Sequence, residues 1–177
     1  RQTQLRERYP QLRVDWLRGN VNSRLAKLDE GQYDAIILAA SGLLRLGFDE
    51  RAKAPIAPEE CLPAIGQGVL GIEIRSDDTW LREIIAPLAH AETTLLVSAE
   101  RAFNQTLNGG CQVPIAGHAV LQGEQIYLRG LVGEPDGSEI LRAEIRGGRE
   151  QAHQLGVELA QQLLARGADR ILATLRE

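Results

Sequence analysis

Apolar and polar residues alternate in three short runs along the second half of the chain. These runs cover Ile115 to Leu121, Glu124 to Glu134 and Ser138 to Gly147, and turn residues separate them at Gln122-Gly123 and Pro135-Asp136-Gly137. A period of two between glycine-containing turns is typical of antiparallel strands joined as hairpins. The pattern therefore predicts a three-stranded antiparallel sheet.

Apolar residues recur at helical spacing on both sides of this predicted sheet. Before it, a helix is expected to begin at Glu92, and Gly109 is the expected left-handed residue that ends it. Its apolar face consists of Leu95, Leu96, Ala99, Phe103 and Leu107. After the sheet, Leu155, Leu159, Leu163 and Leu164 form one face of a helix, and a last short helix is expected from Ala168 to Leu175. Residues 90–177 are thus predicted to form a small αβββα domain of the α+β class.

The first half of the chain alternates helical and strand-like patterns. Helices are predicted from Gln2 to Arg8, from Val21 to Leu28, and in a short segment that carries Arg45. Strands are predicted from Leu12 to Trp16 and from Tyr33 to Ala40; the second is nearly continuous in apolar residues, as in a buried parallel strand. This order of elements indicates an α/β layer with right-handed crossovers.

A connection rich in charge, proline and alanine, residues 49–63, is followed by a glycine-rich segment, residues 64–74. Three glycines have the spacing G-x-G-x-x-G, but they precede an apolar run instead of following a strand, so a dinucleotide site is not expected. The apolar run, which contains Val69, Leu70, Ile72 and Ile74, predicts a strand. A helix that begins at Asp77 or Asp78 and reaches about His90 is expected after it.

Composition places the chain among ordinary globular proteins. Its 177 residues allow one or two domains, and 44% are hydrophobic and 25% charged. No apolar run approaches the length of a membrane span and the first residues lack a secretory signal, so we expect a cytoplasmic protein. The two cysteines lie far apart and the three histidines are isolated, so neither a disulfide framework nor a metal site is expected.

Charge is unevenly distributed along the sequence. The whole chain has a net charge of −4, whereas residues 1–28 carry a local net charge of +5, almost all of it from arginine. Guanidinium groups bind carboxylates and phosphates through two parallel hydrogen bonds, so this end is predicted to attract anions. The alternative is a general preference for arginine, because only Lys27 and Lys53 of the 20 basic residues are lysines.

Three arginines fall near the expected ligand-binding edge of the α/β layer. Arg18 follows the first predicted strand and Arg45 follows the second, and ligands of such layers gather beyond the carboxyl ends of the strands. Arg24 lies six residues beyond Arg18 and reaches the same edge only if the start of its helix folds back. Three solvated arginines without a ligand are the alternative interpretation.

Cys111 is the most accessible candidate for covalent chemistry. It lies in the stretch Asn108-Gly109-Gly110-Cys111-Gln112-Val113-Pro114, between the predicted helix and the first predicted antiparallel strand. Gly110 has no side chain, so a bulky group on the sulfur could lie against the main chain. The alternative is a buried cysteine behind a helix cap, because cysteine is among the most often buried residues.

Five motifs occur in the order found in porphobilinogen deaminases, also called hydroxymethylbilane synthases. They are Leu17-Arg18-Gly19-Asn20, Tyr33-Asp34-Ala35-Ile36-Ile37-Leu38-Ala39, Leu62-Pro63-Ala64-Ile65-Gly66-Gln67-Gly68, Ala99-Glu100-Arg101-Ala102 and Gly109-Gly110-Cys111-Gln112-Val113-Pro114. The chain resembles this family over nearly its whole length. The resemblance implies a partial periplasmic-binding-protein-like α/β lobe at residues 1–65, a crossing segment at 66–89 that returns to a further domain, and a C-terminal α+β domain at 90–177.

The resemblance also implies an activity and a set of binding residues. The family consists of transferases of tetrapyrrole, porphyrin and heme biosynthesis that join four porphobilinogen molecules into hydroxymethylbilane, with release of ammonia, on a covalently bound dipyrromethane cofactor. By this resemblance Cys111 holds the cofactor through a thioether. The other residues implied to bind the cofactor are Arg1, Arg18, Arg24, Arg45 and Gln67. Those implied to bind substrate are Arg18, Arg24, Arg45 and Arg101.

One departure from the family is large. The family has a further N-terminal domain that carries the catalytic aspartate, so no catalytic residue is assigned within these 177 residues, and the chain alone is expected to be an inactive fragment. The same or a separate chain would supply the missing domain, and the complete enzyme is expected to be a monomer that acts on porphobilinogen and its oligomers, not on nucleic acid or membranes. The alternative function is a non-catalytic carboxylate-binding module of the same fold.

Overall fold

The structure, a computed structural model, describes residues 1–110 and 113–173. Its sheet contains three antiparallel strands in the order β1 (Ile115–Gln122), β2 (Gln125–Gly133) and β3 (Ile140–Gly148). Turns centred on Gly123 and Gly137, both with positive φ, connect neighbouring strands. The strands begin and end within two residues of the predicted positions, so the antiparallel sheet is confirmed.

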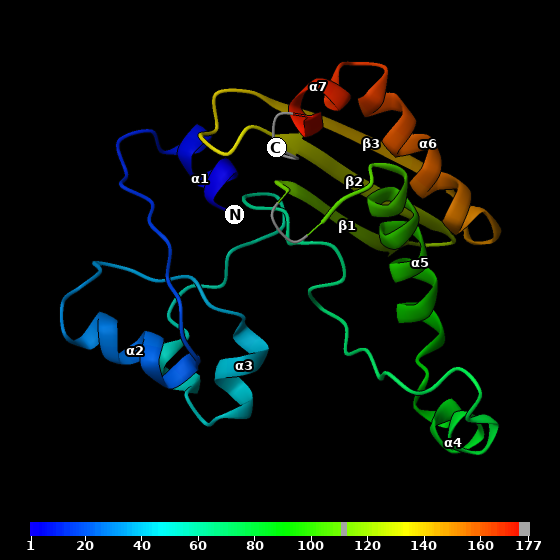
Figure 1. The fold of residues 1–177 in the computed structure, drawn as a ribbon, viewed down its shortest axis with the longest axis horizontal. Coiled ribbons are helices and arrows are strands. Elements are labelled where there is room, and N and C mark those ends of the chain that lie inside the picture. The colour runs from blue at the N-terminus through cyan, green and yellow to red at the C-terminus, as the bar shows by residue number, and fades with distance from the viewer. Residues whose placement is uncertain (111–112, 174–177) are drawn as a thin grey trace.

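Two long helices, α5 (Ala91–Thr106) and α6 (Ala152–Leu164), cover one face of the sheet (Figure 1). The two helices pack closely against each other at Gly156 of α6, because a Cβ there would lie 2.2 Å from the carbonyl oxygen of Ala99 in α5. Phe103 and Leu159 are fully buried between the helices and the sheet. The short helix α7 (Ala168–Ala173) adds Ile171 to the same core. The predicted αβββα arrangement is therefore present.

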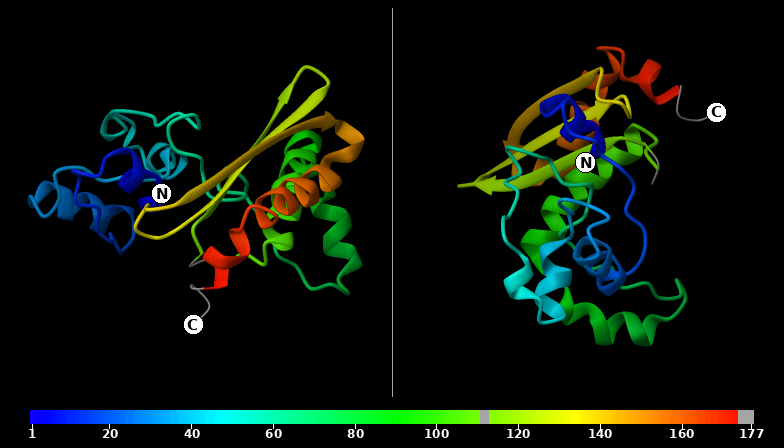
Figure 2. Two further views of the ribbon diagram at one scale, coloured as in Figure 1. Left: turned by 90° about the horizontal axis from the view of Figure 1, so that it is seen from above. Right: turned by 90° about the vertical axis from the view of Figure 1, so that its left-hand side faces the viewer.

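The first helix, α1 (Gln2–Arg8), lies with residues 58–62 near the opposite face of the sheet (Figure 2). Leu62 packs against Ala116 and Leu131, which belong to the outer face of β1 and β2. The turn between β2 and β3 contacts α1 closely, because a Cβ at Gly137 would lie 2.8 Å from the carbonyl oxygen of Thr3. The N-terminal helix and the antiparallel sheet thus share one interface.

The remaining helices are short and carry side-chain caps where the sequence offers them. They are α2 (Val21–Asp29), α3 (Ala40–Arg45), α4 (Thr79–Ile85) and the 3-10 turns η1 (Asp49–Arg51), η2 (Ala86–Leu88) and η3 (Arg149–Gln151). Asn20 accepts a hydrogen bond from the Ser23 amide at 2.8 Å and so caps α2. Asp78 caps α4 by accepting from the Leu81 amide at 2.9 Å, as the sequence predicts. The helix predicted to reach His90 ends earlier, at Ile85.

The three strands predicted in the first half are absent from residues 1–110. No ladder hydrogen bonds join the segments 12–16, 33–40 and 69–74, and the link between the first two is a side-chain bond from the Tyr33 hydroxyl to the Trp16 carbonyl at 2.9 Å. An apolar run becomes a strand only when its backbone finds a paired neighbour. The described residues thus do not form the predicted α/β layer, and the periplasmic-binding-protein-like lobe that the resemblance implies is not confirmed.

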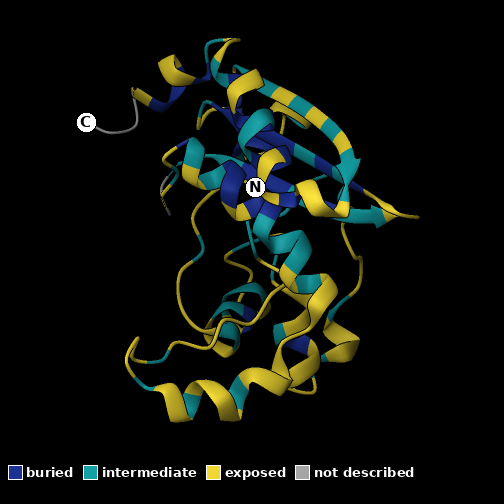
Figure 3. Cartoon of the chain, turned by 90° about the vertical axis from the view of Figure 1, so that its right-hand side faces the viewer, coloured by how far each residue is buried: buried dark blue, intermediate teal, exposed yellow. Residues whose placement is uncertain are grey.

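Burial also differs between the two halves of the chain (Figure 3). Most of the core lies in the sheet, α5 and α6, whereas no residue from Gly66 to His90 is buried. Leu70 is 97% exposed, which is the opposite of what a buried strand requires. Within the described ranges no helix is long and apolar enough to cross a membrane.

The end of α5 also differs from the prediction. The left-handed residue is Asn108, with a φ of +53°, and not Gly109. Asparagine adopts this conformation more readily than most residues. Gly109 is required for space instead, because a Cβ there would lie 2.7 Å from the Ile115 side chain and closer still to that of Asn104.

Candidate anion-binding site

Arg1 and Gln67 are in direct contact although 66 positions separate them. The Arg1 guanidinium donates from Nη2 to Oε1 of Gln67, and both side chains are exposed. Arg1 precedes the first turn of α1, and Gln67 follows Gly66, whose φ is +64°. The structure therefore brings together two of the residues that the sequence assigns to a cofactor site.

A buried glutamine on α1 fixes the segment that leads to Gln67. Gln4 is 6% exposed; its Nε2 donates to the Leu62 carbonyl at 2.9 Å, and its Oε1 accepts from the Leu62 amide at 2.8 Å. Only a neutral primary amide supplies a donor and an acceptor in this arrangement. The contact closes a loop of 58 residues between α1 and the connection.

Glu100 fixes the other end of the same segment. Glu100 is 7% exposed, and its carboxylate accepts from the Gly66 amide at 2.8 Å and from the Ala119 amide at 2.9 Å. His118 Nδ1 lies 3.6 Å from Oε1 of Glu100. A carboxylate buried in this way is held by the backbone donors that it satisfies.

Gln4 and Glu100 were not identified as site residues from the sequence. Glu100 lies within one of the quoted motifs, where it follows Ala99 and precedes Ala102 and Phe103, all of them buried. A carboxylate on the apolar face of a predicted helix was the available signal. Gln4 gave no comparable signal, because its partner is a backbone group 58 positions away.

Arg18 and Arg24 belong to one turn at the start of α2. Arg24 Nε donates to the Gly19 carbonyl at 2.8 Å, and Lys27 Nζ donates to the Arg18 carbonyl at 3.1 Å. The helix start thus carries Arg24 back towards the turn that contains Arg18. Arg18 is exposed and Arg24 is partly exposed, so both guanidinium groups are accessible from solvent.

Arg45 and Arg101 are exposed on other elements. Arg45 lies in the last turn of α3, which approaches α2 where a Cβ at Gly42 would lie 3.8 Å from the Val21 side chain. Arg101 lies on α5 next to Glu100. Among the described residues, no side-chain hydrogen bond or ion pair joins Arg45 or Arg101 to the Arg1–Gln67 contact. The predicted binding residues therefore form separate groups on one chain.

Cys111 and Gln112 lie outside the described residues, so the assignment of a covalent cofactor to Cys111 stays a prediction. The neighbouring Gly110 is exposed, and a Cβ built there would meet no atom within 4 Å. Cys61 is described and is a free, partly buried thiol.

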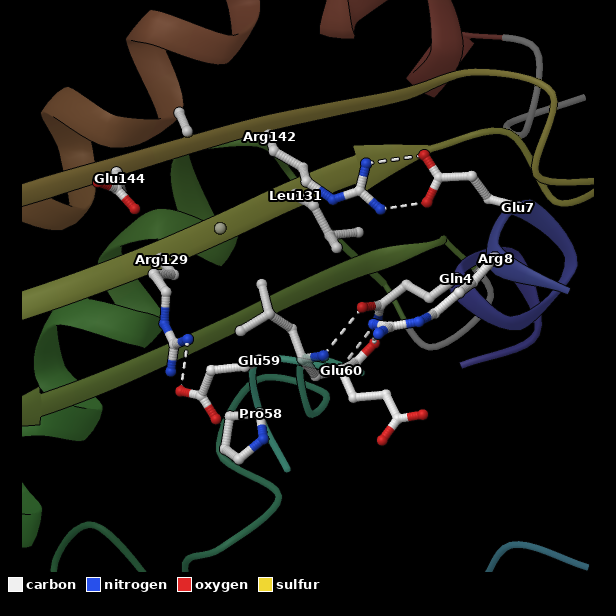
Figure 4. A pocket seen from close by; sticks show the side chains of 13 residues that line it. Gln4, Glu7, Arg8, Pro58, Glu59, Glu60, Arg129, Leu131, Arg142 and Glu144 are labelled. Atoms are coloured by element: carbon white, nitrogen blue, oxygen red, sulfur yellow. Dashed lines mark hydrogen bonds and ion pairs between the residues drawn. The ribbon is translucent and has the colours of Figure 1, made fainter. Parts of the chain in front are cut away.

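A pocket of about 580 Å³ lies elsewhere, between α1, residues 58–62 and the outer face of β2 and β3 (Figure 4). Arg142 forms a two-bond pair with Glu7, and Arg129 Nη1 lies 2.8 Å from Glu59 Oε1. The Arg142 hydrogen bond lowers the pKa of Glu7 below its usual value. None of the residues predicted for cofactor or substrate lines this pocket. Arg142 and Arg129 thus pair with carboxylates, and Arg8 Nη1 donates to the Glu60 carbonyl at 3.3 Å, so the pocket acts as a polar seam between α1, the connection and the sheet.

Comparison with protein families gives two consecutive matches. Residues 1–83 match "Porphobilinogen deaminase, dipyromethane cofactor binding domain", and residues 94–165 match "Porphobilinogen deaminase, C-terminal domain". The first match contains Arg1, Arg18, Arg24, Arg45 and Gln67, and the second contains Arg101 and Cys111. Only residues 84–93 and 166–177 lie outside both matches.

Proposed function

The chain belongs to the porphobilinogen deaminase family, and from this premise we propose that it forms the carboxylate-binding part of a transferase that joins four porphobilinogen molecules into hydroxymethylbilane. The observation that carries the proposal is the match of both family domains, in order, along one chain. The family acts in tetrapyrrole biosynthesis, the route to porphyrins and heme. Ammonia is the other product of the proposed reaction.

The family's cofactor is a dipyrromethane, and the donor set of this chain suits such a group. Each pyrrole ring derived from porphobilinogen carries two carboxylates, so both the cofactor and its extended forms are polyanions. Exposed guanidinium groups form short, charge-assisted and often two-bond contacts with carboxylates. When bound, the cofactor supplies the pyrrole to which further units are joined.

We assign the binding roles residue by residue. Arg1 and Gln67 hold the cofactor, a role supported by their direct contact. Arg18, Arg24 and Arg45 hold carboxylates of cofactor and substrate, and their exposure on α2, α3 and the turn before α2 supports this role. Arg101 binds substrate, and Cys111 holds the cofactor through a thioether. A thiolate suits that bond because it is the nucleophilic form of cysteine.

We also propose the division into residues 1–65, 66–89 and 90–177, with a further N-terminal domain, in the same or a separate chain, that supplies the catalytic carboxylate. The support is the exposed apolar surface of residues 69–88, which includes Leu70, Trp80 and Leu88. Such surface is typical of a segment that packs against something else. The complete enzyme in this proposal is a cytoplasmic monomer.

Mass spectrometry tests the function directly. The complete enzyme, denatured and measured intact, is expected to carry the added mass of two pyrrole rings, and peptide mapping is expected to find them on the peptide that contains Cys111. Cys111→Ser should lack the adduct and Cys61→Ser should keep it. An unmodified chain that still binds small carboxylates would instead favour the non-catalytic module.

A further inference from the structure

The Arg1–Gln67 contact rests on a second contact one helical turn away. Arg1 and Gln4 are separated by three positions, a spacing that places side chains on the same face of a helix. Arg1 meets Gln67, and Gln4 meets the backbone of Leu62. The start of α1 therefore holds the segment 62–67 at both ends.

The backbone between these two contacts has little freedom to adjust. The Gly117 amide donates to the Pro63 carbonyl at 3.1 Å, and the Gly66 amide donates to Glu100 at 2.8 Å. The Gln67 amide closes a turn on the Ala64 carbonyl at 3.0 Å. β1 and α5 thus fix the segment from one side, while Gln4 fixes it from α1.

The orientation of the Gln67 amide gives this arrangement a chemical consequence. Its Oε1 accepts from Arg1, so Nε2 is the atom of that amide able to donate to a ligand. The Arg1 guanidinium has five N–H donors, and the Gln67 contact uses one of them. Together the two side chains present a charged donor and a neutral donor, which suits a single carboxylate.

We infer that Gln4 is a positioning residue for this two-donor carboxylate contact. It acts through the backbone of Leu62, which sets where Gln67 lies relative to Arg1, and it touches no ligand itself. This role rests on the proposed function for the ligand, a pyrrole carboxylate. The geometry on which it stands is independent of that ligand.

The test compares Gln4→Met with Gln2→Met in the 177-residue chain. Methionine keeps the length of the side chain and removes both hydrogen bonds, while Gln2 is a glutamine on the same helix whose one described bond goes to Val14. Porphobilinogen is the probe, because it carries the same two carboxylates as a ring of the cofactor, and titration calorimetry measures its binding to the chain without attached cofactor. Gln4→Met is expected to weaken binding about tenfold, the loss of roughly one positioned hydrogen bond, and Gln2→Met to leave it unchanged.

A double-mutant cycle separates positioning from general damage to the fold. If Gln4 acts through Gln67, Gln4→Met should cause no further loss of porphobilinogen affinity in a Gln67→Leu background. An equal loss in both backgrounds, or no loss in either, overturns the assignment.

Hydrogen exchange at the Gly66 amide decides the case without a ligand. Exchange should become faster in Gln4→Met and stay unchanged in Gln2→Met; an unchanged rate in Gln4→Met overturns the positioning role. Failure of the wild-type chain to bind porphobilinogen counts against the proposed function alone, because the exchange result still decides the role of Gln4.

Discussion

Arg18 and Arg24 share one turn of the chain, and their guanidinium groups are accessible there. Replacing either with leucine in the complete enzyme is expected to weaken binding of the growing pyrrole chain by about 1.5 to 3 kcal/mol, the value of a hydrogen bond to a charged group. Lysine should restore only part of the loss, because it lacks the two-bond geometry. Turnover and the distribution of chain lengths measure the effect.

Arg13 provides the matched control for these variants. Its side chain is 90% exposed and pairs with Asp15, two positions away. Arg13→Leu removes the same charge from the same part of the chain and should leave turnover near that of the wild type. Normal turnover in both Arg18→Leu and Arg24→Leu would remove these arginines from the site.

The residues around Cys61 in the sequence indicate the correct direction for its pKa, but the main physical cause is a different one. Glu59 and Glu60 precede Cys61 in the sequence and would disfavour a thiolate, and the pKa of the thiol is indeed raised. The largest cause is burial, which opposes the charged form; the nearby Arg1 side chain lowers the pKa, and Glu60 makes a smaller contribution that raises it. Sequence neighbours indicated the direction, whereas the burial that dominates depends on the fold.

The raised pKa predicts slow alkylation of Cys61. Because less of the thiol is ionised at a given pH, iodoacetamide should react with Cys61 more slowly than with a cysteine in an unfolded peptide, and the midpoint of the rate profile should lie at higher pH. The urea-unfolded chain is the control. Equal rates in the folded and unfolded chains would contradict this environment. Cys61→Ser should cost at most about 1 kcal/mol of stability.

At the scale of elements, the second half of the chain was predictable because its partners are neighbours in sequence. β1 and β2 are joined through Gly123, so local turn chemistry also fixes their pairing. The run from Tyr33 to Ala40 has a clear apolar pattern but no adjacent hairpin partner. A pattern records which residues favour burial, and it does not say where a backbone partner comes from. The predicted strands failed for that reason.

The contact between α5 and α6 gives a prediction about packing. In an open helix Gly→Ala stabilises by about 0.5 to 1 kcal/mol. At Gly156 the sign should reverse, because the new Cβ would lie 2.2 Å from the Ala99 carbonyl oxygen and force two backbones apart. We expect Gly156→Ala to reduce the free energy of unfolding by about 1 to 3 kcal/mol. Urea unfolding followed by circular dichroism measures it.

Gly71 is the comparison for this substitution. A Cβ there would meet nothing within 4 Å, and its φ is not positive. Gly71→Ala should therefore leave stability nearly unchanged. A Gly156→Ala variant as stable as Gly71→Ala would show that the helices can separate without cost.

At the scale of the whole molecule, the polar seam links α1 to the sheet through the pair of Glu7 and Arg142. The folded-state pKa of Glu7 lies below its ordinary value of 4.5, so its contribution to stability is present above that value and is lost as the pH falls through the folded-state pKa. Glu7 is 36% exposed, so water screens the pair and the contribution should not exceed about 1 kcal/mol.

The pH dependence of the free energy of unfolding follows from the lowered pKa of Glu7. The difference in unfolding free energy between the wild type and Glu7→Gln should be constant from neutral pH to about pH 5 and should shrink at lower pH. In an Arg142→Gln background, which lacks the pair, Glu7→Gln should cause no such pH-dependent change in the free energy of unfolding. A constant difference down to strongly acidic pH would contradict a coupled pair.

The exposed apolar residues between 69 and 88 should make the isolated chain associate. Leu70 is 97% exposed, Trp80 70%, Leu88 69% and Ile72 58%, and the backbone of residues 70–74 makes no ladder hydrogen bonds to other described residues. Apolar surface next to unpaired backbone favours contact with another chain. We expect sedimentation to give a mass that rises with concentration, and the double variant Leu70→Lys, Ile72→Lys to lower it. The control, Gln161→Lys with Gln162→Lys on the exposed side of α6, adds the same charge and should associate like the wild type.

The chain alone should also fail to turn over porphobilinogen, because the proposed catalytic carboxylate lies outside it. A monomer that sustains turnover would overturn both expectations.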